Sequence, residues 1–148
     1  MKKHVFSQPL SVQSALRRSR YTGNNSLPWS VRLPEIRERI ASETPDLIGL
    51  QETGSDTDIG NIVPMSKYTL ISYHFGSFQY GDAALLFKTD RFELLDSGQL
   101  RLGPDPDLPM ALGFRYLAMI RYVNWAVLRE KSSGFTFFSS TPTLTTQA

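Results

Sequence analysis

The chain has 148 residues and a mass of 16.7 kDa, the size of one small domain, and its 41% of apolar residues suffices for a packed core. A formal net charge of +2 does not indicate nucleic-acid binding, and the absence of cysteine excludes disulfide frameworks, thiolate zinc sites and cysteine nucleophiles. No apolar run approaches the roughly 20 residues that a membrane span needs. Ser7, Gln8 and Pro9 follow the N-terminal basic pair where a secretory signal would be apolar, so we expect no signal peptide, and the compartment stays open.

The N-terminal part of the chain is basic, because eight of the 16 Lys and Arg residues lie in the first 40 positions. This end is either an arm that faces phosphate or a solvated tail joined to the polar face of a helix. No aromatic residues interleave with Arg17, Arg18 and Arg20 to stack on bases, which favours the tail. We therefore expect residues 1–19 to form a poorly ordered basic tail.

One amphipathic helix is predicted over residues 30–43. Leu33, Ile36 and Ile40 recur there at helical spacing, with charged residues on the other faces. Ser30 is the expected N-cap, and Pro34 is acceptable only within the first turn. Thr44-Pro45 is the expected end, since the residue before proline avoids the α region.

The rest of the chain predicts strands. The short apolar run at 46–52 is typical of a strand buried on both faces, and the polar residues 54–60 predict a loop. Further strands are expected over 68–75, 83–88, 91–95, 99–102, 120–129 and 135–139, with turns at 97–98 and 131–134. The low-complexity residues 141–148 predict a disordered tail. One helix followed by many strands indicates a mixed α/β protein.

Glu52 is the candidate with the clearest chemistry. It ends the predicted buried strand, and α/β enzymes place ligand groups at such sheet ends. A glutamate there is a hard oxygen ligand suited to Mg²⁺ or Mn²⁺. Taken alone, it is more simply a solvated acid at the end of a strand.

Four segments, in order, resemble the endonuclease/exonuclease/phosphatase superfamily, which has the deoxyribonuclease-I-like fold. The most specific is PDLIGLQE at Pro45–Glu52. The supporting segments resemble the family's first loop and helix entry, its "RFellesG" hairpin and its "RxxxWaxl" strand pair: Arg20–Arg32, Ala84–Gly98, and Arg121–Leu128 with Gly134–Phe137. The match spans roughly residues 20–140, which we expect to be a partial domain.

The resemblance implies an α/β (α+β) fold, the N-terminal half of a two-sheet β-sandwich with flanking helices, here truncated. It also implies hydrolysis of phosphodiesters or phosphomonoesters with Mg²⁺ or Mn²⁺, and it puts Glu52 on the family's metal-binding glutamate. A cation held by a carboxylate would polarise a phosphoryl oxygen, while an aspartate or histidine elsewhere would activate water. The substrate within this class stays open.

Several positions depart from the family pattern. Leu16–Ser19 stands where an asparagine is expected, Thr141 is followed by Pro142 instead of histidine, and the family's second half has no counterpart. We assign no catalytic residue and expect an incomplete, inactive copy from a truncated or mis-spliced gene product, a hypothesis that transcript sequencing tests. The alternative is a non-catalytic remnant or binding module that retains the first sheet of the fold.

Two residues of the predicted strand 120–129 are candidates for substrate binding. Arg121 and Asn124 either contact phosphate or are exposed polar residues of the strand. On the same strand, Val123, Trp125 and Val127 share one face, which half a sandwich would leave without a cover. An uncovered apolar sheet favours association, so we expect a marginal monomer that self-associates through this face.

Overall fold

The computed structural model describes residues 10–11, 28–51, 56–73, 83–102 and 121–142. Along the chain these form β1 (Leu10–Ser11), α1 (Trp29–Glu43), β2 (Leu47–Gln51), α2 (Asp56–Ile62), β3 (Tyr68–Ile71), β4 (Ala83–Lys88), β5 (Phe92–Leu102), β6 (Arg121–Glu130) and β7 (Thr136–Pro142). None of the described helices is both long and apolar enough to cross a membrane.

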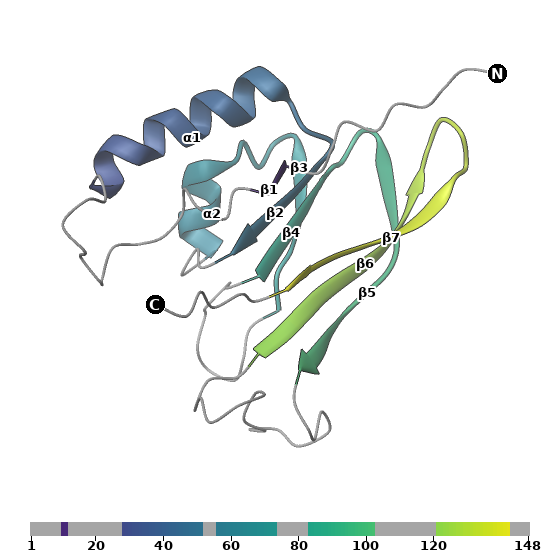
Figure 1. Cartoon of the computed structure of the whole chain (residues 1–148). Coiled ribbons are helices and arrows are strands. Elements are labelled where there is room, and N and C mark those ends of the chain that lie inside the picture. The colour runs from purple at the N-terminus through teal and green to yellow at the C-terminus, as the bar shows by residue number, and fades with distance from the viewer. Residues whose placement is uncertain (1–9, 12–27, 52–55, 74–82, 103–120, 143–148) are drawn as a thin grey trace.

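The elements form three layers (Figure 1). The first sheet has the strand order β1-β2-β4-β3, and the second has the order β5-β6-β7. Helices α1 and α2 cover one face of the first sheet, and the second sheet packs on its other face. β1 runs parallel to β2, and every other pairing is antiparallel. The expected two-sheet architecture with flanking helices is confirmed.

Helix α1 begins one residue earlier than predicted and has a different cap. Its N-cap is Pro28, which makes no side-chain cap bond, so the expected cap by Ser30 is wrong. The Pro28 carbonyl accepts bonds from the N–H groups of Val31 and Arg32 instead. Pro34 therefore falls in the second turn, on an exposed face where water can bond the carbonyl that loses its partner. The helix ends at Glu43, as predicted.

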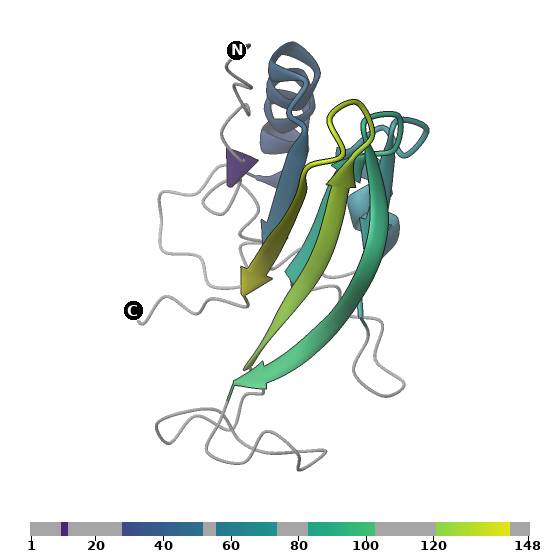
Figure 2. The same cartoon turned by 90° about the vertical axis from the view of Figure 1, so that its right-hand side faces the viewer.

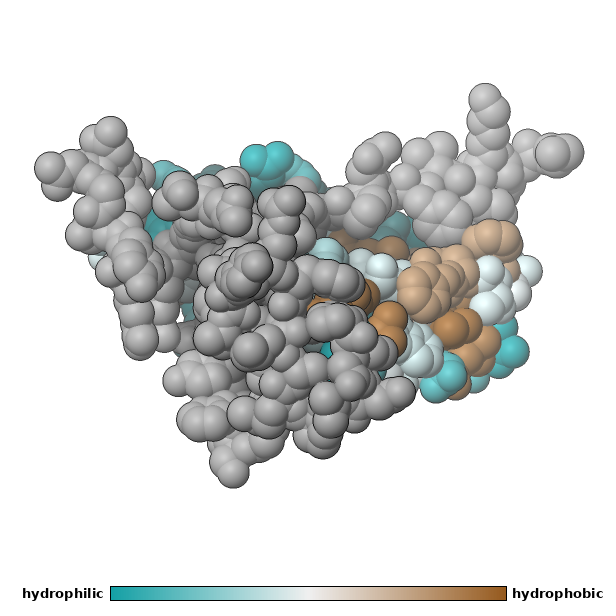
Figure 3. Space-filling view, turned by 60° about the horizontal axis from the view of Figure 1, so that its bottom comes forward, coloured by the Kyte–Doolittle hydropathy of each residue, from teal (hydrophilic) through white to brown (hydrophobic). Residues whose placement is uncertain are grey.

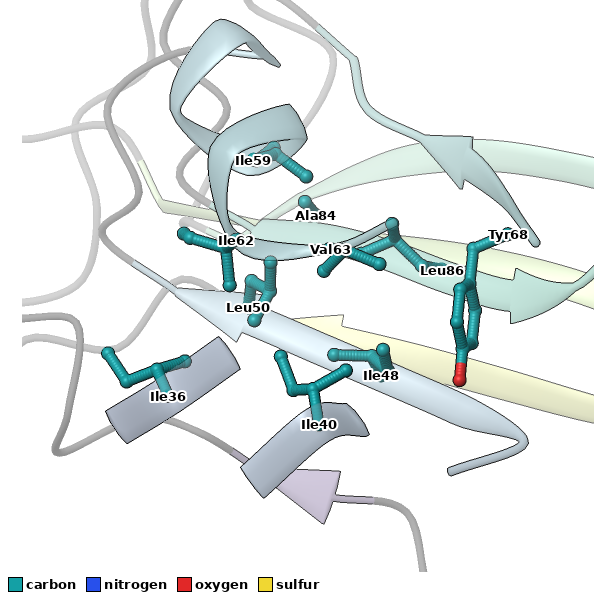
Figure 4. Close-up of a cluster of buried hydrophobic side chains, with 10 residues drawn as sticks. All are labelled: Ile36, Ile40, Ile48, Leu50, Ile59, Ile62, Val63, Tyr68, Ala84 and Leu86. Atoms are coloured by element: carbon teal, nitrogen blue, oxygen red, sulfur yellow. The ribbon is translucent and has the colours of Figure 1, made fainter. Parts of the chain in front are cut away.

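The first core lies between the helices and the first sheet (Figure 4). Strand β2 points Ile48 and Leu50 at Ile36 and Ile40 of α1, and β4 adds Leu86 from the adjacent strand. All five side chains are buried. The helical spacing of the α1 residues and the strand spacing of the β2 residues thus bury one common surface.

Helix α2 corrects the prediction of a loop over 54–60, of which residues 56–60 are described. Ile59, Ile62 and Val63 are all buried against the first sheet, in the same core as Leu50. The polar composition suggested a loop, but one apolar side chain per turn is enough when a sheet covers it. Tertiary burial thus outweighs local propensity in this segment.

The second core lies between the two sheets. It consists of six buried residues from β3 to β6: Ile71, Leu85, Phe87, Phe92, Ala126 and Leu128. β4 faces this core with Leu85 and Phe87 and the first core with Ala84 and Leu86. Burial on both faces explains why the run 83–88 is almost continuously apolar, and the predicted strand is confirmed.

Strand β5 is continuous through the turn that we expected at Ser97-Gly98. It pairs with β6 along its length, with a bulge between Leu94 and Asp96. Gly98 is needed inside the strand, because a Cβ there would lie 2.6 Å from Cζ2 of Trp125. This glycine makes room for an indole ring on the neighbouring strand and does not mark a turn.

The predicted hairpin at 131–134 is confirmed and joins β6 to β7. Gly134 has a φ of 73°, which glycine adopts easily. Its N–H donates to the Glu130 carbonyl, and the Glu130 N–H donates to the Phe135 carbonyl. β7 continues to Pro142, and Thr141 is buried, so the expected disorder is wrong for these two residues. Likewise β1 pairs with β2 inside the segment expected to be a basic tail. The remaining tail residues lie outside the described part.

Candidate functional site at the rim of the sandwich

One end of the sandwich, here called the rim, is formed by strand ends from both sheets. β2 ends there at Gln51, which pairs with Ala83 at the start of β4. In the second sheet, Asn124 near the start of β6 pairs with Thr141 near the end of β7. Figure 2 shows that β2 and β7 run toward the same end of the molecule. The opposite end is called the far end below.

A hydrogen bond between buried side chains joins the two sheets at the rim. Gln51 Nε2 donates to Thr141 Oγ1 at 2.8 Å. Gly49 of β2 also lies close to Thr141, because a Cβ at Gly49 would lie 3.3 Å from Thr141 Oγ1. The glycine and the glutamine of the PDLIGLQE segment thus both serve the contact with β7. We did not single out Thr141 as a structural residue from the sequence, because a lone threonine in a polar stretch carries no such signal.

Asn124 lies deeper, between the sheets. Its Nδ2 donates to the Ala83 carbonyl at 2.6 Å, and its Oδ1 accepts a bond from Gln99 Nε2 at 3.2 Å. Its exposed fraction is 1%, so the alternative of an exposed strand residue is wrong. Asn124 holds the first residue of β4 against the second sheet. A role in phosphate binding stays a prediction.

One buried oxygen at the rim lacks a partner among the described residues. Gln51 Oε1 is inaccessible and accepts no hydrogen bond, although the Nε2 of the same amide is bonded. A buried amide oxygen without a donor is costly unless a water molecule or ligand supplies one. Amide oxygens also suit Mg²⁺ and Mn²⁺, directly or through an ordered water. The chemistry of this end of β2 therefore fits a hard cation.

Of the two other expected site residues, Glu52 and Arg121, the structure describes only the backbone of Arg121. Glu52 lies outside the described residues, directly after the extended end of β2. Arg121 is the first residue of β6, and its backbone pairs with Leu102, while its side chain lies outside the described part. Within the described residues, no group of three or more His, Asp or Glu side chains is arranged to hold a metal ion.

The far end is held by buried charges. Arg91 donates to Glu130 Oε1 from Nη2 at 2.7 Å and also bonds Asp46, which accepts a further bond from Lys88 Nζ at 3.1 Å. The hydrogen bond to Glu130 raises the pKa of Arg91 more than burial lowers it, and Asp46 raises it further. Both carboxylates are buried. Asp46 and Arg91, which belong to the segments that resemble the family, thus lock the sheets together at the end away from Glu52.

The comparisons with known proteins agree with this geometry at the level of the fold. The endonuclease/exonuclease/phosphatase of Bacteroides vulgatus matches with a TM-score of 0.66 and 22% identity, over 78% of this chain and 44% of its own. The mannosyl-6-phosphatase of Bacteroides thetaiotaomicron matches with 0.63 and 23%, over 76% and 42%. The human Nocturnin catalytic domain with a bound sulfate anion matches with 0.59 and 22%, over 78% and 43%.

These matches establish which fold the described residues share. No protein-family model and no curated protein matches the sequence. The chain spans somewhat over two fifths of the length of these three solved structures. It therefore has part of the endonuclease/exonuclease/phosphatase fold, as the sequence resemblance indicated.

Proposed function

We propose that this chain supplies the metal-binding rim of a divalent-metal-dependent phosphoesterase, which hydrolyses phosphodiester or phosphomonoester bonds. The observation that carries the proposal is that β2 ends at Gln51, the residue before Glu52 in the sequence, at a rim that both sheets share. Solved proteins of the same fold include a mannosyl-6-phosphatase. Each residue role below belongs to this proposal.

Glu52 would hold Mg²⁺ or Mn²⁺ through its carboxylate. The bound cation would polarise a phosphoryl oxygen and neutralise the charge that develops on it. Gln51 supports this site in two ways, because its Nε2 fixes the end of β2 to Thr141 and its Oε1 is left to orient a water molecule. Arg121 would bind the phosphate of the substrate through its guanidinium group. Asn124, at the same end of β6, would take part in substrate binding beside it.

Metal-dependent turnover tests the proposal. The purified chain is incubated with Mg²⁺ or Mn²⁺ and a chromogenic phosphodiester or phosphomonoester, and the Glu52→Ala variant is measured beside it. The exposed helix residue Glu38 supplies a matched control, since Glu38→Ala removes the same charge from the solvent-facing side of α1. Turnover that Glu52→Ala abolishes and Glu38→Ala preserves would support the phosphoesterase function.

The same experiment separates the alternative function. If the metal raises the melting temperature of the chain, Glu52→Ala removes that effect and no ester is cleaved, the chain binds the metal without catalysis, as an inactive copy or a binding module does. If neither turnover nor stabilisation by the metal depends on Glu52, the proposed role of the rim is wrong.

A further inference from the structure

The outer face of the second sheet carries an apolar patch that no described element covers. The patch consists of residues that the strand register places on one face: Leu100, Val123, Trp125, Val127 and Phe138. Phe138 is 63% exposed and Leu100 is 54% exposed. The residues of β6 that point to the opposite face of the sheet are buried. Figure 3 shows apolar atoms gathered on the right-hand side of the molecule, the side on which β5–β7 lie. Such surfaces mark interaction sites.

The centre of the patch is built from two ordered aromatic rings. The rings of Trp125 and Phe138 stack with a centroid distance of 6.0 Å and an interplanar angle of 21°. Gly98 leaves the space that the indole occupies. Because Phe138 already packs on Trp125, little conformational entropy is lost when a side chain from another strand packs beside it.

Strand β7 adds a free backbone edge beside this patch. Among the described strands it pairs with β6 alone. The bond from the Glu130 N–H to the Phe135 carbonyl shows which residues of the hairpin form bonded pairs. Bonded and non-bonded pairs alternate along an antiparallel ladder. In this register, Phe137, Ser139 and Thr141 therefore form their backbone hydrogen bonds with β6. The backbone groups of the intervening residues, Thr136, Phe138 and Ser140, therefore face the open edge.

Within β7, the residues from Thr136 to Thr141 lack the usual protection against pairing with another strand. Natural edge strands carry charges, prolines or bulges that block such pairing. From Thr136 to Pro142, β7 contains no charged residue, and its single proline is its last residue. The edge is therefore open to an extended strand of the same kind.

We propose that the occupant of this edge is a second copy of the chain, which pairs its β7 with β7 in antiparallel orientation. A two-fold axis at Phe138 sets this residue opposite its equivalent and Thr136 opposite Ser140 of the second copy. Every one of these positions keeps an N–H group and a carbonyl group for the new ladder. A register shifted by two residues would set Pro142, which lacks an N–H, opposite Thr136. The pairing is closed and symmetric, and it sets the two Phe138 side chains beside each other on the same face of the extended sheet, where they contact across the strands.

The oligomeric state tests this proposal independently of any enzymatic activity. Sedimentation velocity of the full chain between about 1 and 100 µM is expected to show a reversible monomer–dimer equilibrium. Phe138→Lys and Ser140→Pro should each weaken the dimer by about 30-fold or more. The proline removes an N–H from the open edge without removing a bond to β6. Phe135→Lys is the matched control and should leave dimerisation unchanged, because Phe135 is exposed but lies outside the patch.

Four results would overturn the proposal. The first is a wild-type chain that stays monomeric over the whole concentration range. The second is a folded Phe138→Lys or Ser140→Pro variant, with the near-ultraviolet dichroism of the wild type, that dimerises as tightly. The third is open-ended polymerisation, which a closed two-fold contact does not produce. The fourth is slow hydrogen exchange at Phe138 and Ser140 in the monomer, which would show that another part of the same chain covers the edge.

Discussion

Gln51 Nε2 and Thr141 Oγ1 form a 2.8 Å hydrogen bond between residues that are 90 positions apart in the chain. The bond fixes the end of β2, immediately before Glu52, to the second sheet. Both side chains are buried, so neither group can exchange this bond for water without local opening. The orientation of the rim therefore depends on packing between the sheets as much as on β2 itself.

Removal of the Thr141 hydroxyl should destabilise the chain. Thr141→Val leaves the Gln51 amide without its acceptor, and we expect the free energy of unfolding to fall by about 1–3 kcal/mol. Urea unfolding at a fixed protein concentration measures the change. Ser140→Ala is the control, since this neighbouring hydroxyl is exposed and should contribute less than about 0.5 kcal/mol. Equal effects of the two substitutions would contradict the role of the bond.

Glycine 98 should be intolerant of a methyl group. Gly98→Ala puts a Cβ 2.6 Å from the indole of Trp125, and the overpacking should cost about 1–3 kcal/mol. Gly60→Ala in α2 is the matched substitution, because its nearest neighbour would be Met65 Cγ at 3.9 Å. There the better helix propensity should add about 0.5–1 kcal/mol. The two variants should thus shift the urea midpoint in opposite directions, and a loss of stability in both would contradict this account.

Loss of an ion pair at the far end should lower the free energy of unfolding far more than loss of an exposed ion pair in the second sheet. Arg91→Met removes the guanidinium that pairs with both Glu130 and Asp46, which are buried, so we expect a loss of about 3–5 kcal/mol. Arg129→Met removes a 2.7 Å pair with Glu93 in which both side chains are nearly half exposed, and it should cost at most about 1 kcal/mol. Thermal and urea unfolding compare them. Similar losses would show that the buried network adds little.

Tyr68 should make the chain less stable in alkali. Burial raises the pKa of its hydroxyl, with Asp46 and Asp90 adding to the shift, and the hydroxyl donates to the Pro45 carbonyl at 2.6 Å. The unfolded chain then loses this proton before the folded chain does, so stability is full below the ordinary tyrosine pKa and falls as the pH rises above about 10. Tyr68→Phe should be less stable at neutral pH by about 1 kcal/mol and should show a shallower alkaline decline. Unfolding curves between pH 8 and 11 measure both effects, and parallel declines would contradict the assignment.

Periodicity predicted the elements whose two faces have simple environments. The alternation at 122–128 correctly put Val123, Trp125 and Val127 on one face of β6, but it did not predict the burial of Asn124 on the other face, which meets the first sheet. The apolar run at 83–88 correctly indicated a strand. Both patterns depend only on which side of a strand is packed.

The errors have a common cause in contacts between distant segments. Gly98 suggested a turn, but its position is explained by Trp125 on another strand. Residues 54–60 suggested a loop, but the first sheet buries Ile59 and Ile62 of α2. Thr141 was assigned to a disordered tail, although Gln51 bonds it across the sandwich. None of these partners is near in sequence, so no local pattern could reveal them.

The most direct test of the rim as the metal-binding end is paramagnetic broadening by Mn²⁺. Backbone amide signals are followed as Mn²⁺ is added to the wild-type chain and to Glu52→Gln. We predict that Gln51, Ala83 and Thr141 broaden first, that Lys88 and Glu130 at the far end stay sharp, and that Glu52→Gln abolishes the effect. Broadening that begins at the buried carboxylates of the far end, or that is unchanged in Glu52→Gln, would contradict the account.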